Sequence, residues 1–173
     1  MNRLHVIGGK NHGKTTLIVE LIGALRERGL RVGTIKHTHH RHELDTPGKD
    51  SHRHRLAGSS IVGVLSRELA AVYVPTTELG SQPDDWYAAM APAFAGCPIV
   101  LVEGDTETAA PKIEVWRAAG QSQPHAIRIP NVLAMVTDDP IELDLPVFPR
   151  SDLAPLVDWI VARSRGATPS AIG

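Results

Sequence analysis

Short apolar runs alternate along the chain with stretches that have helical periodicity. Leucines recur at four-residue spacing at Leu17, Leu21 and Leu25, which predicts a helix over residues 15–28 with Gly29 as its C-cap. Two further helices are predicted at residues 84–94 and 155–163. The apolar runs predict buried strands at residues 4–7, 30–35, 98–102, 113–116 and 132–136. Strands that alternate with helices in this way predict an α/β fold with a mostly parallel central sheet.

The middle of the chain lacks a clean period. Residues 37–58 are rich in His, Arg, Lys and Asp, and we interpret them as a long functional loop that leads into a short helix at residues 50–57. Residues 60–65 and 70–74 are expected to form two strands joined by a tight polar turn. Because no internal repeat or linker interrupts the pattern, we expect one domain over residues 1–173, with a frayed tail from about residue 166.

Composition narrows the possible classes of protein. The 173 residues are 42% hydrophobic and 21% charged, which is typical of a globular domain that needs no disulfide or structural metal to fold. The net charge of −1 gives no electrostatic reason to expect binding to nucleic acid or to an anionic membrane surface. The single cysteine, Cys97, cannot form an intramolecular disulfide. With no signal peptide and no apolar stretch long enough to span a bilayer, a cytoplasmic protein is expected.

The most specific motif follows the first predicted strand. Residues 8–15 match G-x-x-x-x-G-K-[ST] at every fixed position, which predicts a P-loop. Its glycines allow backbone N–H groups to turn toward a phosphate, Lys14 adds a cation at the β- and γ-phosphates, and the Thr15 hydroxyl is a ligand for Mg²⁺. The predicted nucleotide-binding residues of this loop are Gly8, Gly9, Lys10, Asn11, His12, Gly13, Lys14, Thr15 and Thr16.

Four acidic residues are candidates for the rest of a nucleotide site. Glu103 ends an apolar strand, at the edge where parallel sheets of this kind hold Mg²⁺, and is followed by a glycine. Asp45 and Asp50 flank the turn in the middle loop, and either could reach a metal ion or orient water. Asp138 follows the strand at residues 132–136, and a carboxylate there could accept two N–H bonds from a guanine edge but not from adenine.

Six of the nine histidines are concentrated in the middle loop, which leaves two kinds of ligand open. Imidazoles can bind a transition metal, and neutral imidazoles can also bond to phosphates or to a pterin. The neighbouring cations, Arg41, Lys49, Arg53 and Arg55, suit an anionic ligand better than a metal ion. These histidines are His37, His39, His40, His42, His52 and His54.

Three stretches together resemble the molybdopterin-guanine dinucleotide biosynthesis protein B family. They are residues 8–16, residues 36–58 with the segment Leu-Asp-Thr-Pro-Gly-Lys-Asp-Ser, and residues 101–104 followed by Pro-Lys-Ile-Glu-Val at 111–115. Asp105-Thr106 stands where family members usually carry Phe-Lys, and Glu43 replaces a commoner aspartate. The likeness covers most of residues 2–140, and the middle stretch is its most specific part.

The resemblance implies a P-loop NTPase-like three-layer fold and a GTP-binding, weakly hydrolysing homodimer that depends on Mg²⁺. It implies an accessory role beside a molybdopterin guanylyltransferase, the enzyme that attaches GMP to molybdopterin, and contact with molybdoenzyme maturation factors. By this resemblance Glu103 would belong to the Mg²⁺ shell, and Thr15 and Asp45 complete the predicted metal site. A shared cleft for cofactor or anion, with molybdopterin as a possible ligand, would be lined by His37, His39, His40, Asp45, Lys49 and Asp50.

Two other functions remain open on sequence grounds. The P-loop together with the histidines would suit a nickel or zinc metallochaperone GTPase. A small-molecule kinase would use the same P-loop, with residues 37–58 as a lid over an acceptor pocket. The sequence shows no strong general base and no arginine finger in cis, although Arg53 and Arg55 could act across a dimer, so hydrolysis is expected to be slow.

Overall fold

A computed structural model of the chain describes residues 1–38 and 43–166. The chain divides into two compact units, Met1–Thr38 with Ala93–Gly173 (unit 1) and His39–Pro92 (unit 2), which we describe separately. The expectation of a single domain therefore stays a prediction. His39, His40 and the expected frayed tail beyond residue 166 lie outside the described residues.

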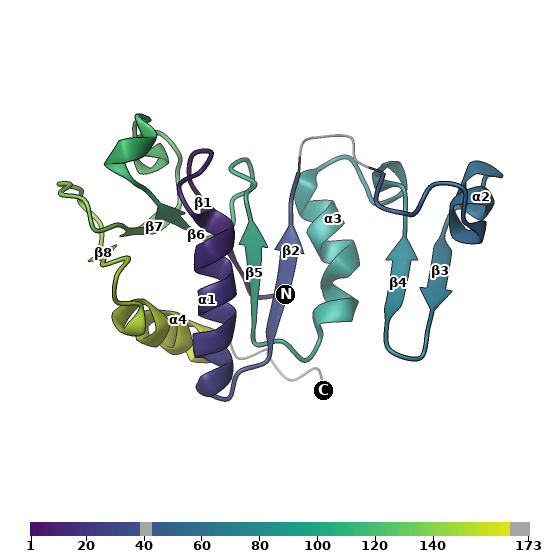
Figure 1. Cartoon of the computed structure of the whole chain (residues 1–173), viewed down its shortest axis with the longest axis horizontal. Helices are drawn as coiled ribbons and strands as arrows, with labels where there is room; N and C mark the ends of the chain where they lie inside the picture. Colours follow the sequence, from purple (N-terminus) through teal and green to yellow (C-terminus); the bar gives the residue numbers. More distant parts are fainter. Residues whose placement is uncertain (39–42, 167–173) are drawn as a thin grey trace. The chain divides into compact units, whose positions relative to one another are not determined.

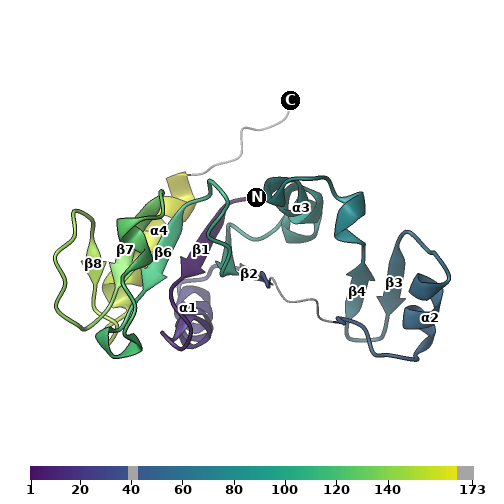
Figure 2. The same cartoon turned by 90° about the horizontal axis from the view of Figure 1, so that it is seen from above.

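Unit 1 is built on a parallel sheet. Its strands follow the order β2-β5-β1-β6-β7-β8, in which the first strand along the chain lies near the centre (Figures 1 and 2). This arrangement confirms the predicted α/β fold with its mostly parallel sheet, and only the two-residue strand β8 had no counterpart in the sequence pattern. The strands are β1 (Arg3–Ile7), β2 (Val32–Lys36), β5 (Ile99–Glu103), β6 (Lys112–Val115), β7 (Val132–Val136) and β8 (Val147–Phe148).

Two helices pack on one face of this sheet and against each other, α1 (Lys14–Glu27) and α4 (Ala154–Gly166) (Figure 1). Alternate residues of β1, β5, β6 and β7 meet the leucines of α1 there and form one apolar core. Gly29 has a φ of 79°, and it donates to Arg26 O while Leu30 donates to Leu25 O, the pattern of a Schellman motif. Gly29 therefore helps to end the helix as predicted, although the C-cap residue itself is Arg28 and Gly29 follows it. At the start of α4, the Asp152 carboxylate accepts the N–H of Ala154 at 3.0 Å.

The opposite face of the sheet is equally buried but carries polar side chains. His5, Lys112 and Glu114 are each 0% exposed. Lys112 Nζ donates to the carbonyls of Thr108 and Ala110 at 2.5 and 3.0 Å, so the segment before β6 folds over this face. The Glu114 carboxylate accepts the N–H groups of residues 125 and 126, in the short 3₁₀ turn η4 (His125–Ile127), at 2.8 and 2.7 Å. Each buried charge is thus matched by hydrogen bonds to backbone.

Unit 2 contains two helices and a hairpin. Helix α2 (Asp50–Leu56) packs beside β3 (Val62–Leu65), which pairs antiparallel with β4 (Ala70–Tyr73) (Figure 2). Ser66 closes the predicted tight turn, because its hydroxyl oxygen accepts the N–H groups of two following residues. The helix expected over residues 84–94 is α3 (Pro83–Met90) followed by a 3₁₀ turn at Ala91–Phe94. Over the described residues, no helix has the length and apolar character needed to cross a membrane.

Candidate nucleotide-binding site

The P-loop joins the carboxyl end of β1 to the start of α1. Gly8, Asn11 and Gly13 have φ angles of 145°, 65° and 95°, a region that favours glycine and tolerates asparagine. A Cβ added at Gly8 would lie 2.3 Å from the carbonyl oxygen of Val115, so this position has no room for a side chain. The loop curls against the end of β6, and Gly13 forms the N-cap of α1 without a side-chain hydrogen bond. The first N–H groups of α1 are therefore available for an anion.

Lys14 is folded back across the loop. Its ammonium group donates to the carbonyl oxygens of Gly8 and Gly9 at 3.0 and 2.8 Å. Burial lowers the pKa of Lys14, nearby Glu103 partly opposes that effect, and Lys36 adds to it. Both carbonyls belong to the P-loop, so the ammonium group is held against the loop.

Thr15 and Glu103 meet between α1 and β5. The Thr15 hydroxyl donates to Glu103 Oε1 at 2.7 Å, and Lys36 Nζ lies 3.8 Å from the same oxygen. The two residues proposed from sequence as metal ligands therefore lie side by side and offer hard oxygen atoms, the donors that Mg²⁺ prefers. The pairing arises because β5 is the neighbour of β1 in the sheet, so both strands end at the same edge.

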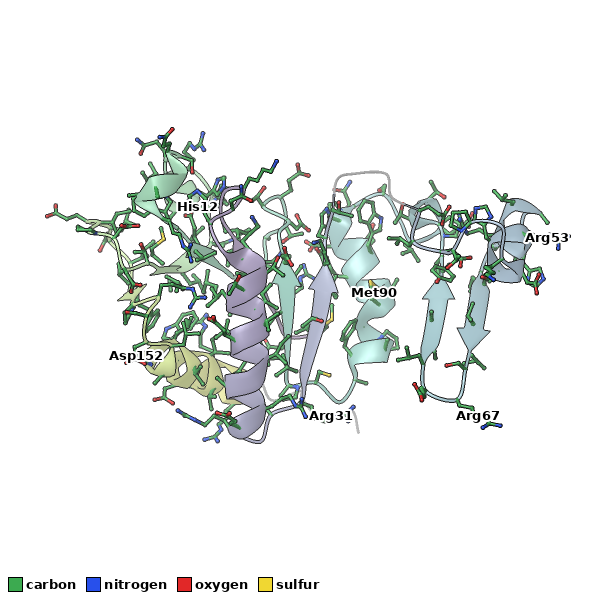
Figure 3. The ribbon with its side chains drawn as sticks, viewed as in Figure 1. His12, Arg31, Arg53, Arg67, Met90 and Asp152 are labelled. Atoms are coloured by element: carbon green, nitrogen blue, oxygen red, sulfur yellow. The ribbon has the colours of Figure 1, made fainter. Side chains whose placement is uncertain are left out.

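His12 is buried in the wall of the loop and is 1% exposed (Figure 3). Its Nδ1 accepts the backbone N–H of Arg117 at 3.1 Å, and its Nε2 lies 3.1 Å from the Ser122 hydroxyl. Since Nδ1 accepts, the proton of the neutral ring is on Nε2. Burial, followed by the charge of Lys14, lowers the pKa of His12. His12 was assigned to nucleotide binding from the motif alone, whereas here its ring connects the loop to the segment after β6.

Three residues near the site were missed from sequence. Arg117 and Ser122 follow β6, and Ser151 follows β8. Each comes shortly after a strand that ends at the same edge of the sheet as the P-loop, which is the signal that could have identified them. The side chain of Arg117 lies against the loop, with Nη2 3.3 Å from the position a Cβ would take at Gly13.

Asp138 lies just beyond the end of β7. Its Oδ1 accepts both the N–H and the hydroxyl of Ser151 at 2.9 Å. These hydrogen bonds, with a further contribution from Arg150, lower the pKa of Asp138. The next residue, Asp139, accepts the N–H of Ala118 at 2.8 Å, so the segments after β6, β7 and β8 are linked.

His37 lies at the end of β2 and belongs to unit 1. Its N–H donates to the carbonyl of Glu103 at 3.0 Å, and its Nδ1 is 3.4 Å from Asp105 Oδ2. Asp105 is 4% exposed with a φ of 60°. The acid that stands in place of the family's usual phenylalanine is thus a buried partner of one of the histidines assigned to the cleft.

Three predicted site residues, Asp45, Lys49 and Asp50, lie in unit 2, whereas Lys10 and Thr16 lie in unit 1. Asp45 is 8% exposed; its Oδ1 accepts from Thr46 N and from Ser51 Oγ, while Oδ2 has no hydrogen-bond partner. Lys49 is the N-cap of α2 and Asp50 begins that helix. Glu43 pairs with Arg55 at 2.5 Å and lies 3.4 Å from His52 Nε2. The assignment of Asp45, Lys49 and Asp50 to one cleft with unit 1 stays a prediction. No group of three or more His, Cys, Asp or Glu placed to hold a metal ion occurs within residues 1–38 and 43–166.

Comparison with protein families gives a match over residues 3–138 to the family described as molybdopterin guanine dinucleotide synthesis protein B. The molybdopterin-guanine dinucleotide biosynthesis adapter protein of Escherichia coli K12 is 35% identical over 150 residues, 86% of this chain and 85% of the relative. The protein of the same name from Haemophilus influenzae is 34% identical over 157 residues, 91% of this chain and 86% of the relative.

Solved structures with the same fold were also found. The crystal structure of a MobB protein homologue from Bacillus stearothermophilus superposes with a TM-score of 0.66 at 27% identity, covering 96% of this chain and 99% of the other. The crystal structure of a molybdopterin-guanine biosynthesis protein B gives a TM-score of 0.70 at 25% identity, covering 94% and 99%. Sequence and structure therefore point to the same group of proteins.

Proposed function

Because the chain belongs to the molybdopterin guanine dinucleotide synthesis protein B family, we propose that it binds GTP and assists the attachment of GMP to molybdopterin. The observation that carries the nucleotide part of this proposal is the loop at residues 8–16. Its Lys14 is folded across the loop, and its Thr15 meets Glu103 at 2.7 Å. The adapter role is supported by the names of the Escherichia coli and Haemophilus influenzae relatives.

A magnesium ion fits the oxygen donors of unit 1. Thr15 and Glu103 would hold it, and when bound it would neutralise charge on the phosphate oxygens. The ammonium of Lys14 would exchange its two carbonyl partners for phosphate oxygens. Asp45 Oδ2 has an unused lone pair, which supports its proposed role toward a cation or a ligand N–H. No general base is assigned, so slow hydrolysis is expected from positioning and charge stabilisation alone.

Guanine selectivity is proposed to come from Asp138. Ser151 fixes one oxygen of its carboxylate, and the low pKa keeps the group ionised at neutral pH. An ionised carboxylate accepts hydrogen bonds from N1–H and N2–H of guanine, whereas adenine presents an acceptor at N1. The position suits this role because β7 and the P-loop strand β1 both lie next to β6 and run parallel to it.

A homodimer is proposed from unit 2. Its hairpin has two strands, and a pair of strands alone is marginally stable and leaves backbone groups unpaired at its edges. Large apolar side chains are exposed around the hairpin, at Ile61, Val64, Leu65, Leu69 and Val72. A second copy of the chain is a suitable cover. The guanylyltransferase and molybdoenzyme maturation factors are the further proposed partners, molybdopterin is a second proposed ligand, and the cytoplasm is the proposed compartment.

The proposal is tested by calorimetric titration with GTP and with ATP, each with and without Mg²⁺. We expect a Mg²⁺-dependent preference for GTP. Lys14→Ala should bind GTP about 10- to 150-fold more weakly, because it loses one charged hydrogen bond. Arg67→Ala is the control, because it removes a cation from the hairpin turn of unit 2 (Figure 3). Equal binding of ATP and GTP would contradict the guanine assignment. Phosphate transfer from ATP to a small molecule would instead favour a kinase, and tight nickel or zinc binding would favour a metallochaperone.

A further inference from the structure

Arg117, on the segment after β6, is a cation beside the P-loop that the P-loop motif does not account for. We propose that its guanidinium binds a phosphate oxygen of the nucleotide held at Gly8–Thr16, and that His12 is the residue that positions it. The inference rests on the proposed function, because it requires a nucleotide in that loop.

The guanidinium of Arg117 lies close to the start of α1. A Cβ built on Gly13 would lie 3.3 Å from Nη2 and 3.7 Å from Cζ of Arg117, so the guanidinium lies against this glycine. Gly13 is the N-cap of α1 and immediately precedes Lys14. Arg117 therefore stands at the point where the loop presents its backbone N–H groups to an anion.

The charges around the P-loop favour an anion beside Arg117. The N-terminus of a helix carries a partial positive charge, and a nearby arginine is unfavourable there unless an anion is present. Lys14 adds a second cation, and within residues 1–38 and 43–166 no carboxylate forms an ion pair with Arg117. Glu114, the carboxylate whose charge acts on His12, already accepts two backbone N–H groups. Three positive features thus converge on the loop, and a polyphosphate is the anion that fits them.

The backbone of Arg117 is held in position by the P-loop itself. His12 Nδ1 accepts its backbone N–H at 3.1 Å, and Nε2–H donates to Ser122 Oγ. The ring fits between two glycines: a Cβ at Gly9 would lie 2.7 Å from Nε2, and one at Gly120 would lie 2.1 Å from it. Because this packing leaves little freedom, the segment that carries Arg117 cannot move independently of the P-loop.

The experiment displaces a fluorescent GTP analogue with GTP and with inorganic tripolyphosphate. Arg117→Ala should weaken the binding of both competitors about tenfold. This value is the lower end of the range for a charged hydrogen bond, and we expect it because Arg117 is exposed to solvent. Arg117→Lys should recover part of the loss. Arg128→Ala, which removes an exposed arginine from the same connection between β6 and β7, should bind like the wild type.

The positioning role of His12 is tested with a double-mutant cycle. His12→Ala should weaken tripolyphosphate binding severalfold in the wild type and have little further effect in Arg117→Ala. His12→Asn, which can keep an acceptor near the N–H of Arg117, should restore most of the affinity. Additive losses from the two alanine variants would contradict the positioning role.

Other outcomes overturn the proposal. If Arg117→Ala weakened the binding of GTP but not of tripolyphosphate, the guanidinium would contact the base or the ribose instead of a phosphate. If the variant bound GTP and tripolyphosphate with wild-type affinity, Arg117 would contact no part of the nucleotide. Failure of the proposed function is distinguishable, because the wild type would then bind no GTP analogue. Circular dichroism melting checks folding, and Arg117→Gln replaces the alanine variant if that variant is unfolded.

Discussion

The two units of the chain differ in how much of their apolar surface they bury. In unit 1 the sheet is buried on both faces, and α1 contributes four buried apolar residues to a continuous core. In the described part of unit 2, the buried apolar side chains are Val62 and Tyr87, whereas eight large ones are exposed: Leu44, Leu56, Ile61, Val64, Leu65, Leu69, Val72 and Met90. The core of unit 1 can therefore fix the geometry of the P-loop, while the apolar surface of unit 2 is suited to contact with another molecule.

The strongest test of this difference compares one leucine from each unit. Leu21→Ala removes a side chain that is 0% exposed and should lower the free energy of unfolding by about 2–5 kcal/mol. Leu65 is 84% exposed, so Leu65→Ala should change the stability of the monomer by less than about 0.5 kcal/mol. Chemical denaturation measures both changes.

Leu65→Ala also tests the proposed use of the unit 2 surface. If a second copy covers the hairpin, this variant should dissociate at higher protein concentration than the wild type in sedimentation equilibrium, while Glu68→Ala in the adjoining turn should not. A wild type that is monomeric at all concentrations would contradict the homodimer, and the apolar surface would then need a different partner.

The next largest effect is expected on nucleotide preference, at Asp138 in unit 1. Asp138→Asn replaces one carboxylate oxygen with an N–H donor, so it should weaken GTP binding about tenfold. Xanthine carries a carbonyl where guanine has its amino group, so the same variant should gain affinity for XTP. Competition binding with GTP, XTP and ATP measures the exchange of preference. Asp144→Asn, in the connection before β8, is the control, and an unchanged preference for GTP would show that Asp138 does not contact the base.

A smaller change, in the Mg²⁺ dependence of GTP binding, should show whether each unit contributes to the proposed metal site. Glu103→Gln removes the charge beside Thr15 and should raise the Mg²⁺ concentration needed for GTP binding severalfold. Asp45→Asn makes the same isosteric change in unit 2. If both variants shift the Mg²⁺ dependence, the two units share the ion, whereas a shift in Glu103→Gln alone would remove Asp45 from the metal site.

Most of unit 1 could be predicted because its strands are apolar runs and its loop is a specific motif. The strand over residues 132–136 has the expected bounds, and α1 differs from the expected helix by one residue at each end. The burial of Lys112 and Glu114 could not be predicted, since it depends on backbone partners from segments that no local pattern connects to β6. β8 was missed because two residues are too short to give a period.

The site residues that belong to one sequence motif could be predicted. The residues that only the fold brings together were harder to predict. The spacing of the P-loop identifies Lys14 and Thr15, and the strand-end position identifies Glu103. The contacts of Arg117 with Gly13 and of Ser151 with Asp138 depend on the order of strands in the sheet, which the sequence does not specify. The residues assigned to a shared cleft, among them Asp45, Lys49 and Asp50, stay predictions.

The smallest expected effect is a pH dependence of the stability of unit 1. Burial lowers the pKa of His5, whose Nδ1–H donates to the carbonyls of Gly104 and Asp105 while Nε2 accepts from Arg3. Below the pKa of about 6.5 of an unfolded histidine, the unfolded chain binds a proton that the folded ring does not. Stability should therefore be complete above that pH and decrease as the pH falls. His5→Asn should reduce the slope of melting temperature against pH between 7 and 5.5, whereas His54→Asn, at an exposed position in unit 2, should not. An unchanged slope in His5→Asn would mean that another group, with His12 the next candidate, controls the acid side of the profile.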